Sequence, residues 1–305
     1  MRIVFMGTPS YATEILKALC AEQTMDVALV VTQEDKPVGR KQILTPPDVK
    51  AWLLAEQSPI EVYQPKTLKS EEAREKIASS KPDFIVVAAY GQILPKAILD
   101  IAPCINLHAS LLPKYRGASP IQSTLLANES YAGVTSMLME EGLDTGAMLA
   151  WSYYHLQKED TSASLFVKLS HMAAQLTIQT LMHFDTLSPL TQISANASHC
   201  KKIKKEDGLI HFDKPAKDIM CYYRAFFPWP GVYIASGLKL LVMEETNTFK
   251  EASVGKILEI SQNGVLVGCQ EGSLLLKMVQ PASKNAMSAL DYIRGKRLNI
   301  GDSLV

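Results

Sequence analysis

The sequence predicts an α/β domain with a parallel sheet, followed by a small β-barrel or sandwich. In the N-terminal half, near-continuous apolar runs rich in β-branched residues alternate with helical segments. Such runs are typical of strands buried on both faces of a parallel sheet and joined by right-handed βαβ crossovers. In the last third of the chain, short apolar-rich runs follow one another closely, as they do in small all-β domains.

The composition is that of an ordinary globular protein. The chain has 305 residues, of which 47% are hydrophobic and 20% are charged, a length that usually divides into two domains. No apolar run approaches the roughly 18 residues that cross a membrane, and the apolar start is broken too early for a signal peptide. The 5 cysteines are scattered without a C-x-x-C pair. We therefore expect a cytoplasmic protein with no disulfide framework, no thiolate zinc site and no membrane partner.

The first elements follow from apolar runs and helix signals. Residues 2–5 form a strand, and Thr8 is the expected N-cap of a helix that begins with Pro9 and ends near Cys20. Only Gly7 follows this strand, so the GxGxxG pattern of dinucleotide sites is missing, and the chain has no GxxxxGK[ST] loop. We therefore expect neither NAD or FAD binding nor the phosphate-binding loop of nucleoside triphosphatases. Further strands are predicted at residues 27–31 and 83–89.

A long loop with a basic centre separates the second and third strands. It covers residues 34–47, includes Arg40 and Lys41, and precedes a helix at residues 48–56. Loops of this length are often functional or mobile. A solvated connector is the alternative interpretation.

The second half of the chain contains a long helix, a polar stretch and several short strands. The helix is predicted at residues 161–183 with Thr161 as its N-cap. The polar stretch that follows is either a solvated spacer or a phosphate-binding segment. Its lysines are Lys201, Lys202, Lys204 and Lys205. The short strands are predicted at residues 231–235, 239–244, 253–259, 264–268 and 273–280.

These elements divide the chain into an α/β domain at residues 1–189, a linker at residues 190–205 and a β domain at residues 206–305. Residues 1–189 carry 16 Lys and Arg against 20 Asp and Glu, whereas residues 190–305 carry 15 against 11. The basic excess of the second part agrees with a polyanionic partner, and it is small enough to be incidental.

The strongest candidates for a catalytic role are Asn106 and His108, at the end of an apolar run. In a strand, positions i and i+2 project from the same face, so the amide and the imidazole can converge on one point. An amide N–H suits the oxyanion of a carbonyl that becomes tetrahedral, and an imidazole can donate to that oxygen or move a proton. Asp144, in a glycine-flanked loop, could orient the imidazole or accept a proton from an attacking amine. The three residues together predict direct transfer of a carbonyl-level group.

No covalent nucleophile and no metal site accompany these residues in the sequence. Ser110 is not part of a GxSxG elbow, and the 6 histidines have neither an HExxH motif nor ligand spacing. A histidine at a strand end and a Gly-Leu-Asp-Thr-Gly turn are each unspecific alone. Their combination with residues 110–117 is specific.

Residues 106–117 read Asn-Leu-His-Ala-Ser-Leu-Leu-Pro-Lys-Tyr-Arg-Gly and resemble the signature of the folate-dependent formyltransferases. Asp144 lies where that family has its catalytic aspartate. The resemblance implies a Rossmann-like formyltransferase domain that binds 10-formyltetrahydrofolate at the carboxyl ends of its strands, and an OB-like β-barrel domain after it. It implies that Asn106, His108 and Asp144 are catalytic. The implied folate contacts are Ser110, Leu111, Leu112 and Pro113.

The likeness extends along almost the whole chain, including residues 5–9, 88–95, 225–231 and 280–289. The basic loop resembles one that enters a tRNA acceptor stem in part of the family. This implies initiator methionyl-tRNA as the acceptor of the formyl group, translation initiation as the process served, and a monomeric enzyme. The implied tRNA contacts are Arg40, Lys41, Lys201, Lys202, Lys204 and Lys205.

Other interpretations stay open at this point. A related formyltransferase could act on an amino-sugar nucleotide, and a formyl-folate hydrolase would share the same core. In a different class, a non-catalytic folate- or RNA-binding module could stack bases on Phe226, Phe227 and Trp229 of its barrel. The same aromatic residues would also suit packing at the interface between the two domains.

Overall fold

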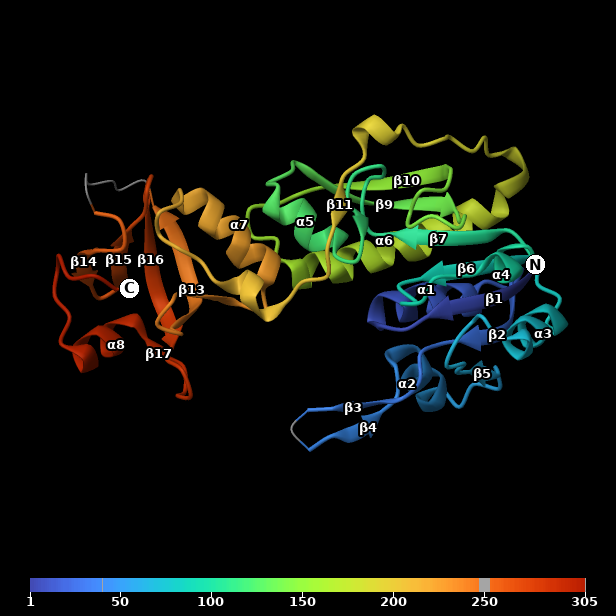
Figure 1. Ribbon diagram of the computed structural model, residues 1–305, viewed down its shortest axis with the longest axis horizontal. Coiled ribbons are helices and arrows are strands. Elements are labelled where there is room, and N and C mark those ends of the chain that lie inside the picture. Colours follow the sequence, from blue (N-terminus) through green and yellow to red (C-terminus); the bar gives the residue numbers. More distant parts are fainter. Residues whose placement is uncertain (40, 247–252, 305) are drawn as a thin grey trace. The chain divides into compact units, whose positions relative to one another are not determined.

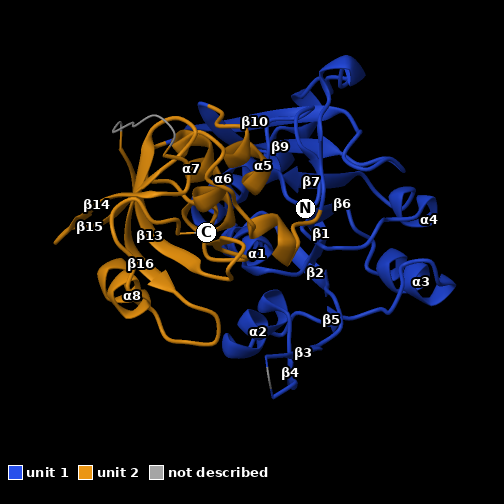
Figure 2. Ribbon diagram, turned by 60° about the vertical axis from the view of Figure 1, so that its left-hand side comes forward, with its two compact units in different colours: residues 1–120, 130–156, 165–201 blue, residues 121–129, 157–164, 202–305 orange. Residues whose placement is uncertain are grey.

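The computed structural model describes residues 1–39, 41–246 and 253–304. The chain folds into two compact units, which Figure 2 colours separately. Unit 1 comprises residues 1–120, 130–156 and 165–201, and unit 2 comprises residues 121–129, 157–164 and 202–305. The chain therefore passes between the units near the predicted linker and also at two short segments, residues 121–129 and 157–164. The boundaries 1–189, 190–205 and 206–305 stay a prediction.

Unit 1 is built on a seven-stranded sheet with the order β10-β9-β7-β6-β1-β2-β5 (Figure 1). Its strands are β1 (Arg2–Gly7), β2 (Asp26–Val31), β5 (Val62–Tyr63), β6 (Phe84–Ala88), β7 (Cys104–His108), β9 (Tyr131–Leu138) and β10 (Met148–His155). The strands from β7 to β5 run parallel, which confirms the predicted parallel sheet. Strands β9 and β10 form an antiparallel edge that the sequence did not predict.

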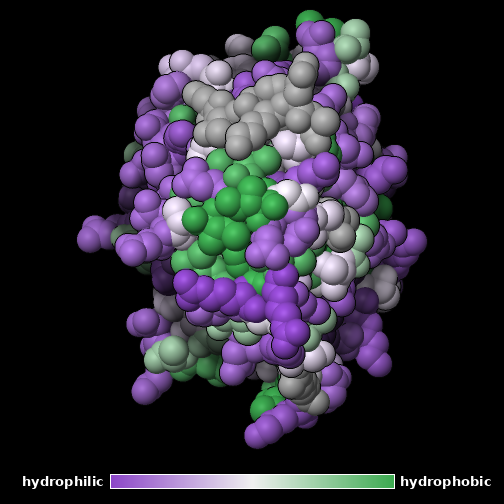
Figure 3. Space-filling model, turned by 90° about the vertical axis from the view of Figure 1, so that its left-hand side faces the viewer, coloured by the Kyte–Doolittle hydropathy of each residue, from purple (hydrophilic) through white to green (hydrophobic). Residues whose placement is uncertain are grey.

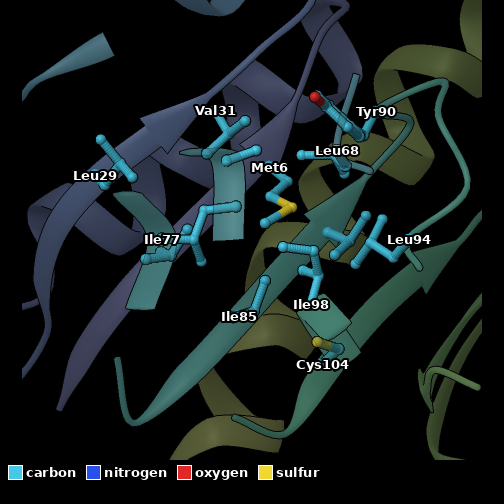
Figure 4. Packing of buried hydrophobic residues seen from close by; sticks show 13 residues of the cluster. Met6, Leu29, Val31, Leu68, Ile77, Ile85, Tyr90, Leu94, Ile98 and Cys104 are labelled. Atoms are coloured by element: carbon cyan, nitrogen blue, oxygen red, sulfur yellow. The ribbon is translucent and has the colours of Figure 1, made fainter. Parts of the chain in front are cut away.

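Alternation along the strands gives this sheet two apolar faces. The helices around it are α1 (Ser10–Ala21), α2 (Asp48–Ala55), α3 (Glu71–Ser79), α4 (Lys96–Leu99) and, from residue 165 onward, α6 (Ser162–Met182). On one face, Val4 and Met6 join a buried cluster with Ile77 of α3 and Ile98 of α4 (Figure 4). The intervening strand residues, such as Phe5, are also fully buried, and α1 packs against β1, β2 and β6. Burial on both faces explains why the strands read as continuous apolar runs.

The strand order reverses beside β1. The chain runs outward from β1 to β2 and β5, returns to β6 on the other side of β1, and continues to β7. In open α/β sheets, ligands bind outside the carboxyl ends of the strands near such a reversal. Ala88 ends β6 and His108 ends β7, so the fold brings the signature residues to this edge.

The two predicted helix caps have different outcomes. Thr161 caps α6, because its Oγ1 accepts a hydrogen bond from the backbone N–H of Ser164. Thr8 does not cap α1, which begins at Ser10 without a side-chain cap. The Thr8 hydroxyl instead donates to the carbonyl of Tyr90. The turn after β1 lies beside the end of β6, and this tertiary neighbour takes the hydroxyl from the helix.

The predicted loop at residues 34–47 contains a hairpin. β3 (Lys36–Val38) and β4 (Ile43–Thr45) pair in antiparallel fashion. Gly39, with a φ of +71°, leads out of β3 in the left-handed region that glycine adopts readily. Strands this short carry no readable alternation of apolar and polar residues, which is why the sequence indicated only a loop. Val38, Ile43 and Leu44 are exposed on the hairpin.

Unit 2 contains an antiparallel sheet with the order β12-β13-β16-β15-β14, and β17 pairs with β16. Its strands are β12 (Val232–Tyr233), β13 (Lys239–Thr246), β14 (Ile257–Ser261), β15 (Gly264–Gly268), β16 (Ser273–Gln280) and β17 (Met287–Ser288). The predicted series of short strands is thus confirmed, with β14 starting later than expected. Its helices, which the sequence did not predict, are α5 (Pro120–Leu126), α7 (Ala216–Phe226) and α8 (Ala289–Lys296).

The face of the molecule drawn in Figure 3 is mostly hydrophilic but has an apolar region. Figure 3 shows this region, bordered by hydrophilic side chains, on the side of the molecule where β14 and β15 lie. Val254 and Ile300 are among the exposed apolar residues of the unit. Of the helices formed by residues 1–39, 41–246 and 253–304, none could span a bilayer.

Candidate active site

Asn106 and His108 lie on one face of β7, at its carboxyl end. Asn106 pairs with β6 on one side and β9 on the other, and His108 pairs with Thr135 of β9. Asn106 is only 8% exposed and His108 only 7% exposed. A buried amide and imidazole are costly unless they find partners, so their contacts identify what the site is built to hold.

The main partner is Asp144, from the loop between β9 and β10. The Asn106 Nδ2 atom donates to Oδ1 of Asp144 over 3.4 Å, and Oδ2 lies 3.6 Å from His108 Nδ1. The backbone N–H of Gly117 also donates to Oδ2, over 2.8 Å. The structure therefore brings together the three residues that the sequence singled out, although Asp144 is 38 positions from Asn106. Among the described residues, the second Nδ2 hydrogen of Asn106 has no protein acceptor.

The His108 ring is oriented by a backbone carbonyl. Its Nε2 atom lies 2.9 Å from the carbonyl oxygen of Tyr115. A carbonyl only accepts, so Nε2 carries a hydrogen, and this assigns the tautomer. In the neutral ring Nδ1 is then an acceptor. Only the protonated ring can donate from Nδ1 toward the space it shares with Asp144.

Gly117 makes the Asp144 contact possible. Its φ is +120°, and a Cβ atom there would lie 2.2 Å from the carbonyl oxygen of Cys200. The chain passes this close because β8 (Arg116–Gly117) pairs with β11 (His199–Cys200). Only glycine fits this position, which explains the glycine at the end of the signature.

The residues implied as folate contacts form a tight turn after β7. The Ser110 hydroxyl is fully buried and donates to the carbonyl of Lys114. Leu112 packs against Met137 and Met148. These two side chains therefore point into the protein, whereas Leu111 and Pro113 are half-buried. A ligand beside this turn would meet Leu111, Pro113 and the backbone.

Thr135 of β9 holds this turn in place. Its Oγ1 donates to the carbonyl of Ser110 over 2.6 Å and accepts the N–H of Leu112 over 3.0 Å. Thr135 is fully buried. The sequence did not single out this residue, because β9 was not predicted and a threonine in a strand is an ordinary residue.

A second feature that the sequence did not predict is the pair of Arg116 and Gln192. The Oε1 atom of Gln192 accepts from Arg116 Nε over 2.9 Å and from its Nη2 over 2.7 Å. The Nε2 atom of Gln192 donates to the carbonyl of Asp144 over 2.9 Å and to that of Gly146 over 2.8 Å. Gln192 lies in the stretch predicted as a linker, where the sequence carried no signal for a site residue.

The lysines implied as tRNA contacts are all on the surface. Lys41, beside the β3–β4 hairpin, and Lys201 are exposed in unit 1. Lys202, Lys204 and Lys205 are exposed in unit 2. Arg40 lies outside the described residues.

The three aromatic residues of the barrel segment differ in burial. Phe226 is buried in unit 2 and packs edge-on against Tyr222, with ring centroids 5.7 Å apart. Phe227 is 42% exposed and Trp229 is 58% exposed. The Phe227 ring is tilted against that of Tyr223, with centroids 6.3 Å apart. The predicted packing at the domain interface stays a prediction.

Other reactive groups near the site are few. Cys104 starts β7, and burial raises the pKa of its thiol to about 12. The thiol therefore stays protonated at neutral pH and is a poor nucleophile. Within residues 1–39, 41–246 and 253–304, no group of three or more His, Cys, Asp or Glu side chains could hold a metal ion.

Comparison with known proteins shows the family of this chain. Residues 1–181 match the formyl transferase family, and residues 202–297 match the formyl transferase C-terminal domain. An open α/β sheet followed by an antiparallel-sheet domain is thus the fold of a formyl transferase, and the chain belongs to that family.

Within the family, the chain groups with the methionyl-tRNA formyltransferases. It is 56% identical over 303 residues to the methionyl-tRNA formyltransferase of Nitratiruptor sp., covering 99% of each chain. It is 51% identical over 302 residues to that of Campylobacter lari, again covering 99% of each chain.

Solved structures share the fold at much lower identity. One is an N-formyltransferase from Helicobacter canadensis in complex with folinic acid and dTDP-3-aminofucose, with a TM-score of 0.68 and 18% identity over 90% of this chain and 98% of that one. Another is HypX from Aquifex aeolicus in complex with tetrahydrofolic acid, with a TM-score of 0.62 and 14% identity over 96% of this chain and 47% of that one.

Proposed function

We propose that this protein transfers the formyl group of 10-formyltetrahydrofolate to the α-amino group of methionine on initiator tRNA, giving N-formylmethionyl-tRNA for translation initiation. The observation that carries the chemistry is the convergence of Asn106, His108 and Asp144, whose polar atoms lie 3.4 Å and 3.6 Å apart. The acceptor is supported by full-length relatives at 56% and 51% identity that are named methionyl-tRNA formyltransferase.

The proposed reaction is a direct transfer. The neutral amine attacks the formyl carbon, a tetrahedral oxyanion forms, and the bond from that carbon to the folate nitrogen breaks. One proton leaves the amine and one reaches the departing nitrogen, so the charges balance. Free α-amino groups have a pKa of about 7.7–8.0, so a useful fraction is already neutral near pH 7. Positioning and oxyanion stabilisation therefore supply most of the acceleration.

The three residues have distinct proposed roles. The Nδ2 hydrogen of Asn106 that Asp144 does not use donates to the oxyanion. His108 in its protonated form donates from Nδ1, first to the oxyanion and then to the departing nitrogen. Asp144 orders the imidazole and assists removal of the proton from the amine.

Each co-substrate is assigned to its own set of residues. We place the folate against the turn at residues 110–113, where Leu111 and Pro113 offer apolar surface, while Ser110 and Leu112 act through the backbone they shape. For tRNA, the exposed lysines Lys41, Lys201, Lys202, Lys204 and Lys205, together with Arg40, are the proposed phosphate contacts. The domains at residues 1–189 and 206–305 with their linker, a cytoplasmic location and a monomeric state belong to the same proposal.

One experiment separates this function from its alternatives. 10-Formyltetrahydrofolate is offered with initiator methionyl-tRNA, elongator methionyl-tRNA or an amino-sugar nucleotide, and each product is quantified by mass spectrometry. We expect formylation of initiator methionyl-tRNA. Formylation of the sugar alone, or loss of the formyl group to water with every acceptor, would overturn the proposed acceptor. Folate binding without any turnover would indicate a non-catalytic module.

A further inference from the structure

The backbone of Asp144 has a left-handed conformation, which is uncommon for residues other than glycine. Its φ is +54°, in the left-handed region that non-glycine residues enter at a cost. This conformation places the carboxylate next to Asn106, His108 and the N–H of Gly117. A backbone in this region persists where its surroundings fix it, so the contacts of this turn show what keeps the carboxylate in place.

The amide of Gln192 makes the contacts that hold it. Its Nε2 donates to the carbonyl oxygens of Asp144 and Gly146, which bracket the turn. Its Oε1 accepts two N–H groups from Arg116, which is itself only 6% exposed. An amide has two N–H donors and an oxygen with two lone pairs, so all four hydrogen-bonding positions of Gln192 are filled. Arginine only donates and carbonyls only accept, so the orientation of the amide follows from its partners.

Arg116 connects this amide to the other side of the site. The residue before it, Tyr115, provides the carbonyl that orients His108. The residue after it, Gly117, provides the N–H that binds the Asp144 carboxylate. Gln192 therefore bridges the backbone of Asp144 to the short strand that positions both His108 and the carboxylate.

We propose that Gln192 is a positioning residue for formyl transfer, which holds the Asp144 carboxylate in place against Asn106 and His108. This role rests on the proposed function of those three residues. It adds a fourth side chain that touches neither substrate and acts through the Asp144 backbone.

Gln192→Glu is the variant that tests this role. Glutamate keeps oxygens for Arg116 but places an oxygen, instead of two N–H donors, against the carbonyls of Asp144 and Gly146. The measurements are the single-turnover rate at saturating 10-formyltetrahydrofolate and methionyl-tRNA, the two KM values and the melting temperature. We expect the saturated rate to fall about 100-fold, as for a misplacement on the order of 1 Å, with little change in either KM.

Gln64→Glu is the matched control. Gln64 also accepts from a cation, Lys50, and donates to the backbone carbonyl of Gln33, but it contacts none of the three site residues. Gln64→Glu should lower the melting temperature and leave the saturated rate unchanged. If Gln192→Glu behaves in the same way, Gln192 is only structural and the inference fails.

A double-variant cycle with Asp144→Asn gives the second readout. If Gln192 acts through Asp144, Gln192→Glu should slow the Asp144→Asn enzyme by less than about threefold, whereas independent effects would multiply. Multiplying effects would overturn the inference. A wild-type rate in Asp144→Asn would contradict the proposed function itself. A slow Asp144→Asn beside a wild-type Gln192→Glu would contradict only the role of Gln192.

Arg116→Lys keeps the test decisive if Gln192→Glu does not fold. Lysine retains the buried charge and one donor to Oε1, so the amide of Gln192 is held less firmly. We expect a loss of about tenfold in the saturated rate, again smaller in the Asp144→Asn background. An unchanged saturated rate, or the same tenfold loss in both backgrounds, would overturn the inference.

Discussion

The Nε2 atom of His108 lies 2.9 Å from the carbonyl oxygen of Tyr115, seven residues further along the chain. The turn that contains residues 110–113 therefore leads directly to the Tyr115 carbonyl, which orients the imidazole. The proposed folate contacts and the proposed catalytic ring share one piece of backbone. Displacing that turn should disturb both binding and chemistry.

The first prediction concerns Asn106. Asn106→Ala removes the proposed oxyanion donor, and the loss of one such donor typically costs about 10²–10³ in rate. We expect a decrease of that size in single-turnover transfer, with unchanged folate affinity in a fluorescence titration. Asn196→Ala, at an exposed position, is the control and should behave as wild type. Near-full transfer by Asn106→Ala would refute the assigned role.

The second prediction concerns the anchor of the folate turn. Thr135→Val keeps the shape of the side chain but leaves the Leu112 N–H and the Ser110 carbonyl without their buried partner. Each unsatisfied group costs about 1–3 kcal/mol of stability. We expect a lower melting temperature and a KM for folate raised about tenfold, the loss typical of one hydrogen bond. Thr135→Ser retains the hydroxyl and should restore both, and an unchanged KM in Thr135→Val would show that the turn does not bind folate.

The third prediction concerns the polyanionic acceptor. Phosphate contacts release counterions, so binding that depends on them weakens steeply with salt. We expect log KM for methionyl-tRNA to rise linearly with log salt concentration, while KM for folate changes little. A salt-insensitive KM for methionyl-tRNA would count against lysine–phosphate contacts.

The fourth prediction assigns that salt dependence to residues. Replacing Lys41 or Lys204 by alanine should raise KM for methionyl-tRNA and lower the salt slope by about 1 for each phosphate that the protein no longer neutralises. Lys81→Ala and Lys284→Ala are the matched controls, because both lysines are exposed and neither is proposed to bind tRNA. Equal salt slopes in all four variants would show that methionyl-tRNA binds to a different surface.

The fifth prediction concerns alkaline stability. Burial raises the pKa of Cys104 from 9.0 to about 12. Between these values the unfolded chain loses the thiol proton and the folded chain keeps it, so the free energy of unfolding falls as pH rises. Urea unfolding from pH 8 to 11 should reveal this decline. In Cys104→Ala the decline should be shallower by about one proton, and parallel curves for the two proteins would contradict the shifted pKa.

The sequence predicted the parallel sheet, because strands buried on both faces are continuous apolar runs. It also predicted most of the short strands of unit 2, because they appear as short apolar runs at close spacing. It missed β9 and β10, although they form the antiparallel edge of the sheet. It also indicated a loop where the β3–β4 hairpin lies. The predicted cap at Thr8 was wrong because its hydroxyl donates to the carbonyl of Tyr90, just after β6, and no local sequence pattern reveals that contact.

By itself, the sequence determined the pairing of Asn106 and His108 on one strand face, since strand alternation is a local property of the backbone. It also singled out Asp144 and the turn at residues 110–113. Only the tertiary structure decided which distant groups complete the site. The Tyr115 carbonyl binds His108, Thr135 binds the turn, and Gln192 binds both Arg116 and the backbone of Asp144. These contacts join positions up to 76 residues apart, and their geometry depends on strand order and loop path. A hydrogen bond between residues far apart in the sequence produces no local sequence pattern. Such partners can therefore be identified only in the folded structure.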